Sequence, residues 1–461
     1  MVTQHINLFR NLETVVRELD ERGHETIMLH GTPREMPGAR ASGAAPKPKM
    51  AFMGRGMEVA EARVASLSTG HRPDPDRALR HKLARFGRKV MNRSIYLRRA
   101  HPAPERVLAS LDRSLPRGMK CILGSRAIGA VLSQPRALRA WRRLEGSRAP
   151  SRRIASMLAD VRPDVVLVSP SVWPKDPVEA DYLHAAHTLG IPTVGYLNSW
   201  DNLTSKGTLH VLPDVFIVWN EALATEAERI HLIPRDIIRV TGAPHLDHFF
   251  ELAPSVPHAE TCRQLGCRGE GPYVVYLCSS RTLIADETHI VTRLADSLRR
   301  VLGDAAPTIV VRPHPVNPAP WQRYACAGTA VYPRQGDQAD TPESWQDYFN
   351  QLAGAACFVG LNTTAFLEAA VADHPCLTIV SDEFYEQQGR TGHFRHLLEA
   401  DFLEVCADVD AVAAGVARVL GGADQKAAGR RQFVERFLRP RGVRIPARSV
   451  VADTILELAA P

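Results

Sequence analysis

From residue 162 onward, short apolar runs alternate with longer amphipathic segments, and this alternation limits the fold more than any other feature. Residues 165–169 and 192–197 are examples of the apolar runs. Strands with this composition are buried on both faces, because helices cover the two faces of a parallel sheet. The sequence therefore predicts an α/β protein built on parallel sheets.

The alternation occurs in two series, which predicts two Rossmann-like doubly wound domains facing a cleft. The first series continues with strands at 215–219 and 238–241. The second has strands at 273–278, 308–312, 357–360, 376–380 and 402–406. We expect an N-terminal domain over 1–250, a linker over 251–272, a C-terminal domain over 273–440 and a final helix within 441–461. A length of 461 residues suits such a division.

The start of the chain offers little material for a first strand. Residues 8–22 have helical spacing of apolar side chains, and residues 26–30 read as a strand. A doubly wound domain normally has a strand before its first helix, but Met1 to Ile6 can supply only a stub.

The positive charge is concentrated in one region. The chain has a formal net charge of +7, yet residues 72–153 carry +17 and the remainder carries −10. We therefore expect a basic helical insert over 72–158 in the N-terminal domain. Its plain interpretation is the solvated face of a helical bundle, but basic amphipathic helices also lie on anionic membrane surfaces. The confinement of the charge favours an anionic membrane or a lipid-phosphate acceptor over nucleic acid.

Other features narrow the class of protein. No apolar run approaches the roughly 20 residues that span a bilayer, and the chain does not start with a secretion signal. We expect a cytoplasmic protein, peripheral at the inner face of the membrane. The eight cysteines lack the paired spacing of a zinc site, so we expect inert thiols and no metal.

Polar residues follow the strands of the second series, where ligands bind in open parallel sheets. They are Ser279, Ser280, Arg312, His314, Asn362, Thr363 and Thr364. Arg312 and His314 are donors suited to a diphosphate, and the helix start at Thr364 can hold a phosphate or simply be capped. Glu368, in the following helix, is a candidate acceptor for ribose hydroxyls.

The first series has its own polar loops. Ser169 and Ser171 follow one strand, and the next is followed by a loop with Trp200, Asp201, Asn202 and Lys206. A loop this rich in amides and hydroxyls indicates a ligand, although Trp200 also suits a packing role. We predict that Ser169, Ser171, Trp200, Asn202 and Lys206 bind an acceptor.

Six segments, in this order, support a family resemblance. They are RGHE, SWDNLTSKG, VTGAPHLDHFF, VVRPHP, FVGLNTTAFLEAAV and FYEQQGRTGHFRHLL. Together they resemble bacterial surface-carbohydrate glycosyltransferases of the two-Rossmann-domain (GT-B) architecture. The chain is also similar to CDP-glycerol glycerophosphotransferases, which share a Gly-x-Pro-x-x-Asp element and an Arg/Lys-x-His-Pro element. The resemblance covers most of residues 8–30 and 162–400.

The resemblance implies a nucleotide-sugar donor in the C-terminal domain and a glycan or lipid-linked acceptor in the N-terminal domain. Transfer would occur across the cleft without a metal or cofactor. The donor-binding elements map onto the polar residues Arg312, His314, Asn362, Thr363, Thr364 and Glu368. The loop that closes on the donor maps onto Gln387, Arg390, Thr391 and His393.

Glycosyl transfer needs charge stabilisation of the leaving diphosphate and, with inversion, a base for the acceptor hydroxyl. The candidates for the first role are Arg312, His314, Arg390 and the helix start at Thr364. Asp201 is our first choice as base and His5 the second.

Three alternatives stay open. A CDP-glycerol-type polyol phosphotransferase would release CMP, and a non-catalytic membrane-surface scaffold would keep the fold alone. A nucleotide-sugar 2-epimerase is disfavoured, because the carboxylate-rich group expected for proton abstraction is not evident in the sequence.

Overall fold

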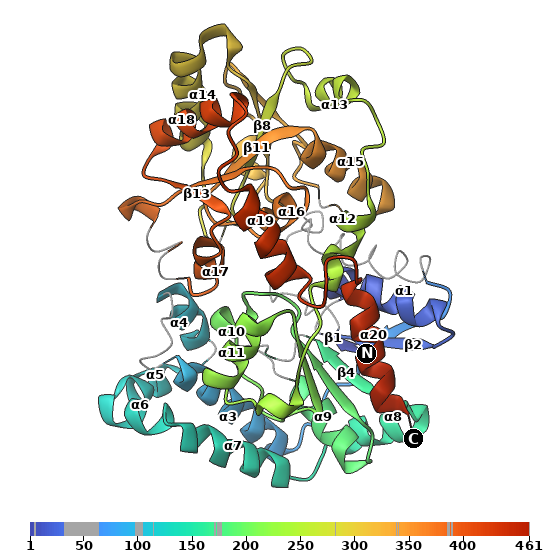
Figure 1. Ribbon diagram of the computed structural model, residues 1–461. Helices are drawn as coiled ribbons and strands as arrows, with labels where there is room; N and C mark the ends of the chain where they lie inside the picture. The colour runs from blue at the N-terminus through green and yellow to red at the C-terminus, as the bar shows by residue number, and fades with distance from the viewer. Residues whose placement is uncertain are drawn as a thin grey trace, which may run out of the picture. The chain divides into compact units, whose positions relative to one another are not determined.

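The computed structural model describes residues 1–3, 6–31, 64–96, 105–113, 115–169, 172, 178–281, 283–337, 339, 341–384, 388 and 391–460. It divides into two compact units (Figure 1). Unit 1 comprises Met1–Asp247 and Arg439–Pro461, and unit 2 comprises His248–Leu438.

Unit 1 contains a seven-stranded sheet in the order β3-β2-β1-β4-β5-β6-β7. All neighbouring strands run parallel. The strands are β1 (Val2–Thr3), β2 (Thr26–His30), β3 (Leu67–His71), β4 (Val166–Ser169), β5 (Thr193–Tyr196), β6 (Val215–Val218) and β7 (Ile238–Val240). The stub expected at the start of the chain is β1, a strand of 2 residues that pairs with β2 on one side and β4 on the other.

The helices of unit 1 cover the sheet and build the insert. They are α1 (Glu13–Glu21), α3 (Leu79–Ile95), α4 (Glu105–Asp112), α5 (Arg117–Gly124), α6 (Arg126–Leu132), α7 (Pro135–Ser147), α8 (Arg152–Val161), α9 (Glu179–Thr188), α10 (Asn202–Ser205), α11 (Glu221–Arg229) and α20 (Ala447–Ala459). Val15 of α1 and Val451 of α20 belong to one buried cluster with Val194 of β5. The C-terminal segment therefore completes the core of unit 1.

Unit 2 contains a six-stranded parallel sheet in the order β10-β9-β8-β11-β12-β13. The strands are β8 (Tyr273–Leu277), β9 (Thr308–Arg312), β10 (Thr329–Val331), β11 (Ala355–Gly360), β12 (Cys376–Ile379) and β13 (Leu403–Cys406). The helices are α13 (His258–Leu265), α14 (Thr288–Leu302), α15 (Pro342–Ala353), α16 (Ala365–Val371), α17 (Phe394–Glu399), α18 (Val409–Leu420) and α19 (Ala427–Phe433), and α12 (Asp247–Glu251) leads into the unit.

Burial on both faces explains the continuous apolar strands. In unit 2, Val274 and Ile309 pack in one cluster with Leu294 of α14 and Val412 of α18. Figure 1 shows α14 and α18 side by side on the same side of this sheet. The prediction of two doubly wound parallel sheets is confirmed, because each sheet reverses its strand order around its first strand.

The units divide the chain differently from the expected domains in two places. The segment 251–272, expected as a linker, contains helix α13, which packs against α15 within unit 2. The final helix, expected within 441–461, is α20 and belongs to unit 1. Among the described residues, no helix is long and apolar enough to cross a membrane.

A buried group of charges fixes the insert to the sheet domain. Arg88 of α3 donates to Asp181 of α9 at 2.6 Å and to Glu145 of α7 at 2.6 Å, and all three side chains are buried. Arg148 also pairs with both carboxylates. The nearby Arg88 charge opposes the cost of burial and holds the pKa of Asp181 far below its usual value. Part of the basic surplus of the insert is therefore internal.

We expect Arg88→Met to destabilise the protein by about 3 kcal/mol, because the change leaves buried carboxylate charge undercompensated. Urea denaturation measures the loss. Arg139→Met, which removes an exposed arginine of α7, is the control and should change the free energy of unfolding by less than about 0.5 kcal/mol. Equal stability of the two variants would contradict the structural role of Arg88.

Candidate functional site

The strand register of unit 2 brings the predicted donor-binding loops to one edge. Leu277, the last residue of β8, is paired with Arg312 on one side and with Gly360 on the other. The β8–β11 pair is the point at which the strand order reverses, where open parallel sheets bind ligands. The loops that begin at Ser279, Arg312 and Asn362 therefore start next to one another.

A buried carboxylate that the sequence did not reveal organises the β8 loop. Glu287, which is 1% exposed, accepts hydrogen bonds from the Ser279 amide at 2.7 Å, the Ser279 hydroxyl at 3.1 Å and the Tyr276 hydroxyl at 3.1 Å. Burial raises the pKa of Glu287 to about 7, against the lowering effect of these hydrogen bonds. Ser279 is itself buried, whereas Ser280 is partly exposed.

The predicted residues Arg312 and Glu368 are joined through one aromatic ring. The Arg312 guanidinium lies 3.7 Å from the ring centroid of Tyr348 and donates to Gln351 Oε1 at 2.8 Å. The Tyr348 hydroxyl donates to Glu368 Oε2 at 2.6 Å. Tyr348 and Gln351 come from α15, so this helix places a cation and a carboxylate beside the same sheet edge.

The loop after β9 fixes the ring of His314. The Val316 amide donates to His314 Nδ1 at 3.2 Å, so the proton of the neutral ring is on Nε2. Asn317 ties this loop to the β8 loop, because its amide nitrogen Nδ2 donates to the Ile284 and Ala285 carbonyl oxygens. The two loops thus support each other.

The loop after β12 folds back onto the end of β11. Asn362 Nδ2 donates to Thr391 Oγ1 at 3.2 Å, and both residues are buried. Gln388 Nε2 donates to the Leu361 and Ile379 carbonyl oxygens at 3.0 and 2.7 Å. These contacts fasten two of the predicted donor residues to each other.

The remaining predicted residues of unit 2 lie nearby in sequence. Thr363 Oγ1 accepts from the Ala365 amide at 3.3 Å, which is a local cap, and Thr364 is exposed at the start of α16. His393 is partly buried at the start of α17. Gln387 and Arg390 of the predicted closing loop, and likewise His5 and Ser171, lie outside the described residues.

In unit 1, the predicted acceptor residues differ in exposure. Ser169 is buried and its hydroxyl donates to Asn198 Oδ1 at 3.3 Å. Trp200 is also buried, which fits the packing interpretation. Asp201 accepts from Ser205 Oγ at 2.6 Å and from Asn202 Nδ2 at 3.1 Å. The candidate base is therefore held within its own loop.

Helices of the basic insert hold the end of this loop. Asn92 Oδ1 of α3 accepts from the Thr208 amide at 2.9 Å, and the Trp141 indole of α7 donates to His210 Nδ1 at 3.1 Å. The carbonyl oxygen of Lys206 accepts from the Tyr96 hydroxyl. A Cβ at Gly207 would lie 2.5 Å from Asn92 Oδ1, so this close approach requires glycine.

Asp247, the carboxylate of the Gly-x-Pro-x-x-Asp element, has a structural role. It accepts from the amides of Ala447 and Arg448 at the start of α20, at 3.1 and 2.7 Å. It also pairs with Arg439 at 2.6 Å. The element therefore anchors the C-terminal segment, residues 439–461, to the rest of unit 1.

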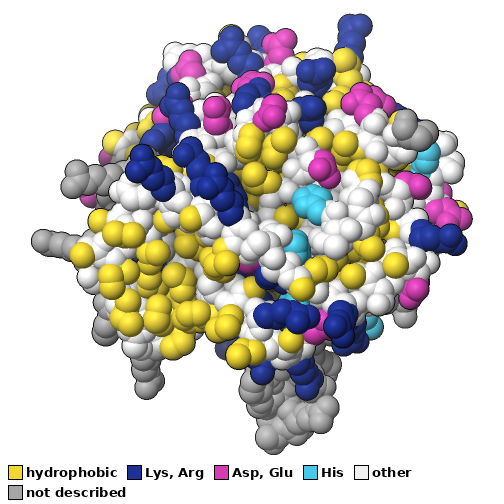
Figure 2. Space-filling view, turned by 90° about the horizontal axis from the view of Figure 1, so that it is seen from below, with side chains coloured by type: hydrophobic (Ala, Val, Ile, Leu, Met, Phe, Trp, Pro, Cys, Tyr) yellow, Lys and Arg dark blue, Asp and Glu magenta, His cyan; other side chains and the backbone are white. Residues whose placement is uncertain are grey.

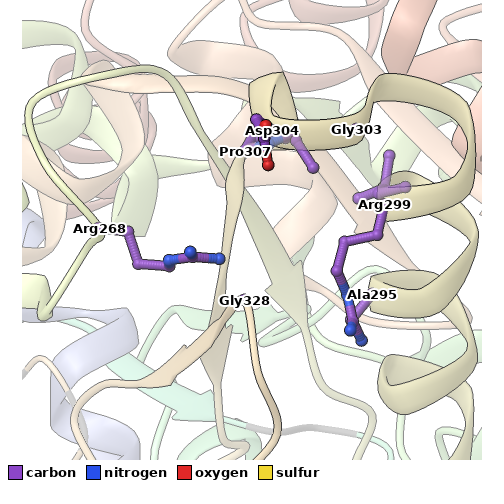
Figure 3. Close-up of a pocket in the computed structure, with 9 residues that line it drawn as sticks. Arg268, Ala295, Arg299, Gly303, Asp304, Pro307 and Gly328 are labelled. Carbon is purple, nitrogen blue, oxygen red and sulfur yellow. The ribbon is translucent and has the colours of Figure 1, made fainter.

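A cavity of about 140 Å³ in unit 2 lies away from these loops (Figure 3). Pro307 and Gly328, which line it, directly precede β9 and β10, so the cavity is at the amino ends of the strands. Arg299, also in its wall, pairs with Asp296. Among the described residues, no group of three or more His, Cys, Asp or Glu side chains could hold a metal ion.

Sequence reasoning missed Glu287, Tyr348 and Gln351. Asp286-Glu287-Thr288 reads as an ordinary charged helix start, and the polar positions of α15 read as solvent-facing. The one available signal for Glu287 was its position, ten residues after a buried strand at the edge where ligands bind.

We expect Glu287→Gln to flatten the dependence of stability on pH. The native pKa is raised above the ordinary 4.5, so the wild type is most stable with Glu287 protonated and loses stability as pH rises from about 5 through about 7. The glutamine variant should avoid this loss, on the order of 2 kcal/mol. Urea denaturation between pH 5 and about 8 measures the difference.

The control variant is Glu383→Gln, which removes an exposed carboxylate of unit 2 and should follow the wild-type profile. Parallel profiles for the wild type and Glu287→Gln would show that the native carboxyl is not perturbed.

No protein-family model and no curated protein matches the sequence. The fold is similar to that of a UDP-GlcNAc 2-epimerase from Neisseria meningitidis bound to UDP-GlcNAc, with a TM-score of 0.53 and 11% identity, over 99% of this chain and 98% of that one. A putative UDP-N-acetylglucosamine 2-epimerase from Listeria monocytogenes matches with a TM-score of 0.53 and 10% identity, over 98% of this chain and 95% of that one. A glycosyltransferase from Rickettsia africae matches with a TM-score of 0.49 and 9% identity, over 99% of this chain and 97% of that one. The chain has the two-domain fold of the two epimerases, which is of the GT-B type, as the resemblance implied.

Proposed function

We propose that the protein is a glycosyltransferase that moves a sugar from a nucleotide-sugar donor to a surface-glycan or lipid-linked acceptor. The donor would bind at the carboxyl edge of the unit 2 sheet, and the acceptor at the corresponding edge of unit 1. The observation that carries the proposal is the Arg312–Tyr348–Glu368 group beside the point where the strand order reverses.

The geometry of Arg312 and His314 suits a diphosphate. A guanidinium presents N–H donors in a planar fork that matches paired phosphate oxygens. Tyr348 and Gln351 orient that fork, and the tautomer of His314 supplies an N–H donor at Nε2. Both groups would stabilise the charge that develops on the leaving nucleoside diphosphate.

Glu368 and Asp201 complete the proposed assignment. The Glu368 carboxylate, held by Tyr348, would accept hydrogen bonds from the ribose hydroxyls of the donor. Asp201, held by Ser205 and Asn202, would accept the proton of the attacking hydroxyl. The metal-independent form of the reaction is part of the proposal, and full activity in excess EDTA is expected.

We expect UDP, GDP or CDP to raise the melting temperature of the wild type, because binding to the native state stabilises it in proportion to ln(1 + [L]/Kd). Arg312→Met and His314→Ala should each weaken nucleotide binding roughly tenfold or more, as the loss of a charge-assisted hydrogen bond predicts. Each shift is measured against the same variant without nucleotide, which separates binding from intrinsic stability.

Arg323→Met, which removes an exposed arginine of unit 2, is the matched control and should bind as the wild type does. Unchanged nucleotide binding in both Arg312→Met and His314→Ala would refute the donor site. A wild type that responds to none of the three nucleotides would favour the scaffold alternative.

One observation favours a second candidate function. The structures that share this fold with a TM-score of 0.53 are named as UDP-GlcNAc 2-epimerases. An epimerase would convert UDP-GlcNAc without an acceptor and would exchange the C2 hydrogen with deuterium from D2O. The proposed transferase would release a nucleoside diphosphate only with an acceptor, and a CDP-polyol phosphotransferase would release CMP. Product analysis of these incubations discriminates among the three reactions.

A further inference from the structure

We propose that helices α5, α6 and α7 of unit 1 form a surface that docks on an anionic lipid bilayer. The proposal adds a partner to the proposed function, since a lipid-linked acceptor would be met at such a bilayer. It rests on the distribution of exposed charge and exposed apolar side chains over these three helices.

Several arginines of the insert are engaged inside unit 1. Arg88 and Arg148 form ion pairs with the buried carboxylates of Glu145 and Asp181. Arg142 donates to the carbonyl oxygens of Leu209, His231 and Leu232. The net charge of residues 72–153 therefore overstates what the insert presents to a partner.

Other arginines of the insert face solvent. Arg136, Arg139 and Arg143 of α7 are exposed, and their spacing of three and four residues places them on one side of the helix. Between residues 115 and 148 the sequence has one acidic residue, Glu145, and this side chain is buried. The exposed side of α7 is thus cationic, and no exposed carboxylate from residues 115–148 compensates its charge.

Large apolar side chains are also exposed on α5, α6 and α7. Val131 of α6 is 66% exposed, Leu144 of α7 is 63% exposed, and Ile122 of α5 and Ile128 of α6 are also exposed. The helices pack in series, α5 on α6 and α6 on α7. Figure 2, seen from the side on which Figure 1 draws these helices of unit 1, shows apolar side chains gathered beside Lys and Arg side chains.

This combination fits a bilayer interface. Branched aliphatic side chains enter the boundary between headgroups and acyl chains, while arginines remain at the level of the lipid phosphates. The phosphates of a nucleic acid would pair with the arginines, but they would make no favourable contact with the four exposed aliphatic side chains. Charge complementarity and apolar exposure together therefore favour an anionic membrane.

The test is co-sedimentation of the full chain with vesicles of phosphatidylcholine, with and without phosphatidylserine. We expect binding only with phosphatidylserine, and weaker binding at high salt. The triple variant Arg136→Gln, Arg139→Gln, Arg143→Gln should bind roughly a hundredfold more weakly, about fivefold per charge. Val131→Ser, which leaves the charge unchanged, should also bind several-fold more weakly.

The matched control removes three exposed arginines from a helix of unit 2, with the changes Arg293→Gln, Arg299→Gln and Arg300→Gln. It should bind vesicles as the wild type does. Equal binding to both vesicle types, or wild-type binding by the α7 triple variant, would overturn the proposal. Binding of duplex DNA that the triple variant loses and Val131→Ser retains would assign the surface to nucleic acid instead.

Nucleotide-induced stabilisation of the α7 triple variant separates this proposal from the proposed function. Loss of vesicle binding with an unchanged nucleotide response supports the docking surface alone. Intact vesicle binding in a protein that responds to no nucleotide would refute the donor site and leave the docking surface standing.

Discussion

Parallel strand pairing is the constraint on which the structure depends. Every strand in both sheets runs parallel to its neighbours, so each sheet needs helices on both faces and has all its carboxyl ends at one edge. Residues far apart in sequence meet there for this reason. Leu277, Arg312 and Gly360 are register partners although more than eighty residues separate the first from the last.

The strands could be predicted where both of their faces are buried, because burial leaves a continuous apolar run. β8, β9 and β12 are of this kind. β3 and β10 were missed because they are partly exposed and contain small or polar residues such as Gly70 and Thr329, whereas the other two edge strands, β7 and β13, could be predicted. A strand with so few large apolar side chains is specified by its neighbour more than by its own sequence.

The site was predictable to a similar extent. Residues that directly follow buried strands could be located from the sequence, since the topology fixes their edge. Their partners could not, because Glu287 directly precedes α14 and Tyr348 lies in α15, and both look like ordinary surface positions in a linear pattern. Arg88 of the basic insert was missed for a related reason. The buried Arg88 pairs with Asp181, which is more than ninety residues away in the sequence. Long-range pairing of this kind leaves no local signal.

The contacts of α3 and α7 with residues 206–210 give the insert a second structural role. Trp141 contacts His210 of this loop from the side of α7 that lies opposite Arg136, Arg139 and Arg143. The helix is thus a spacer of fixed thickness between the solvent face of the insert and the loop that contains Asp201. On a bilayer, that thickness would set the height of the loop above the headgroups and so the length of lipid-linked chain that reaches it.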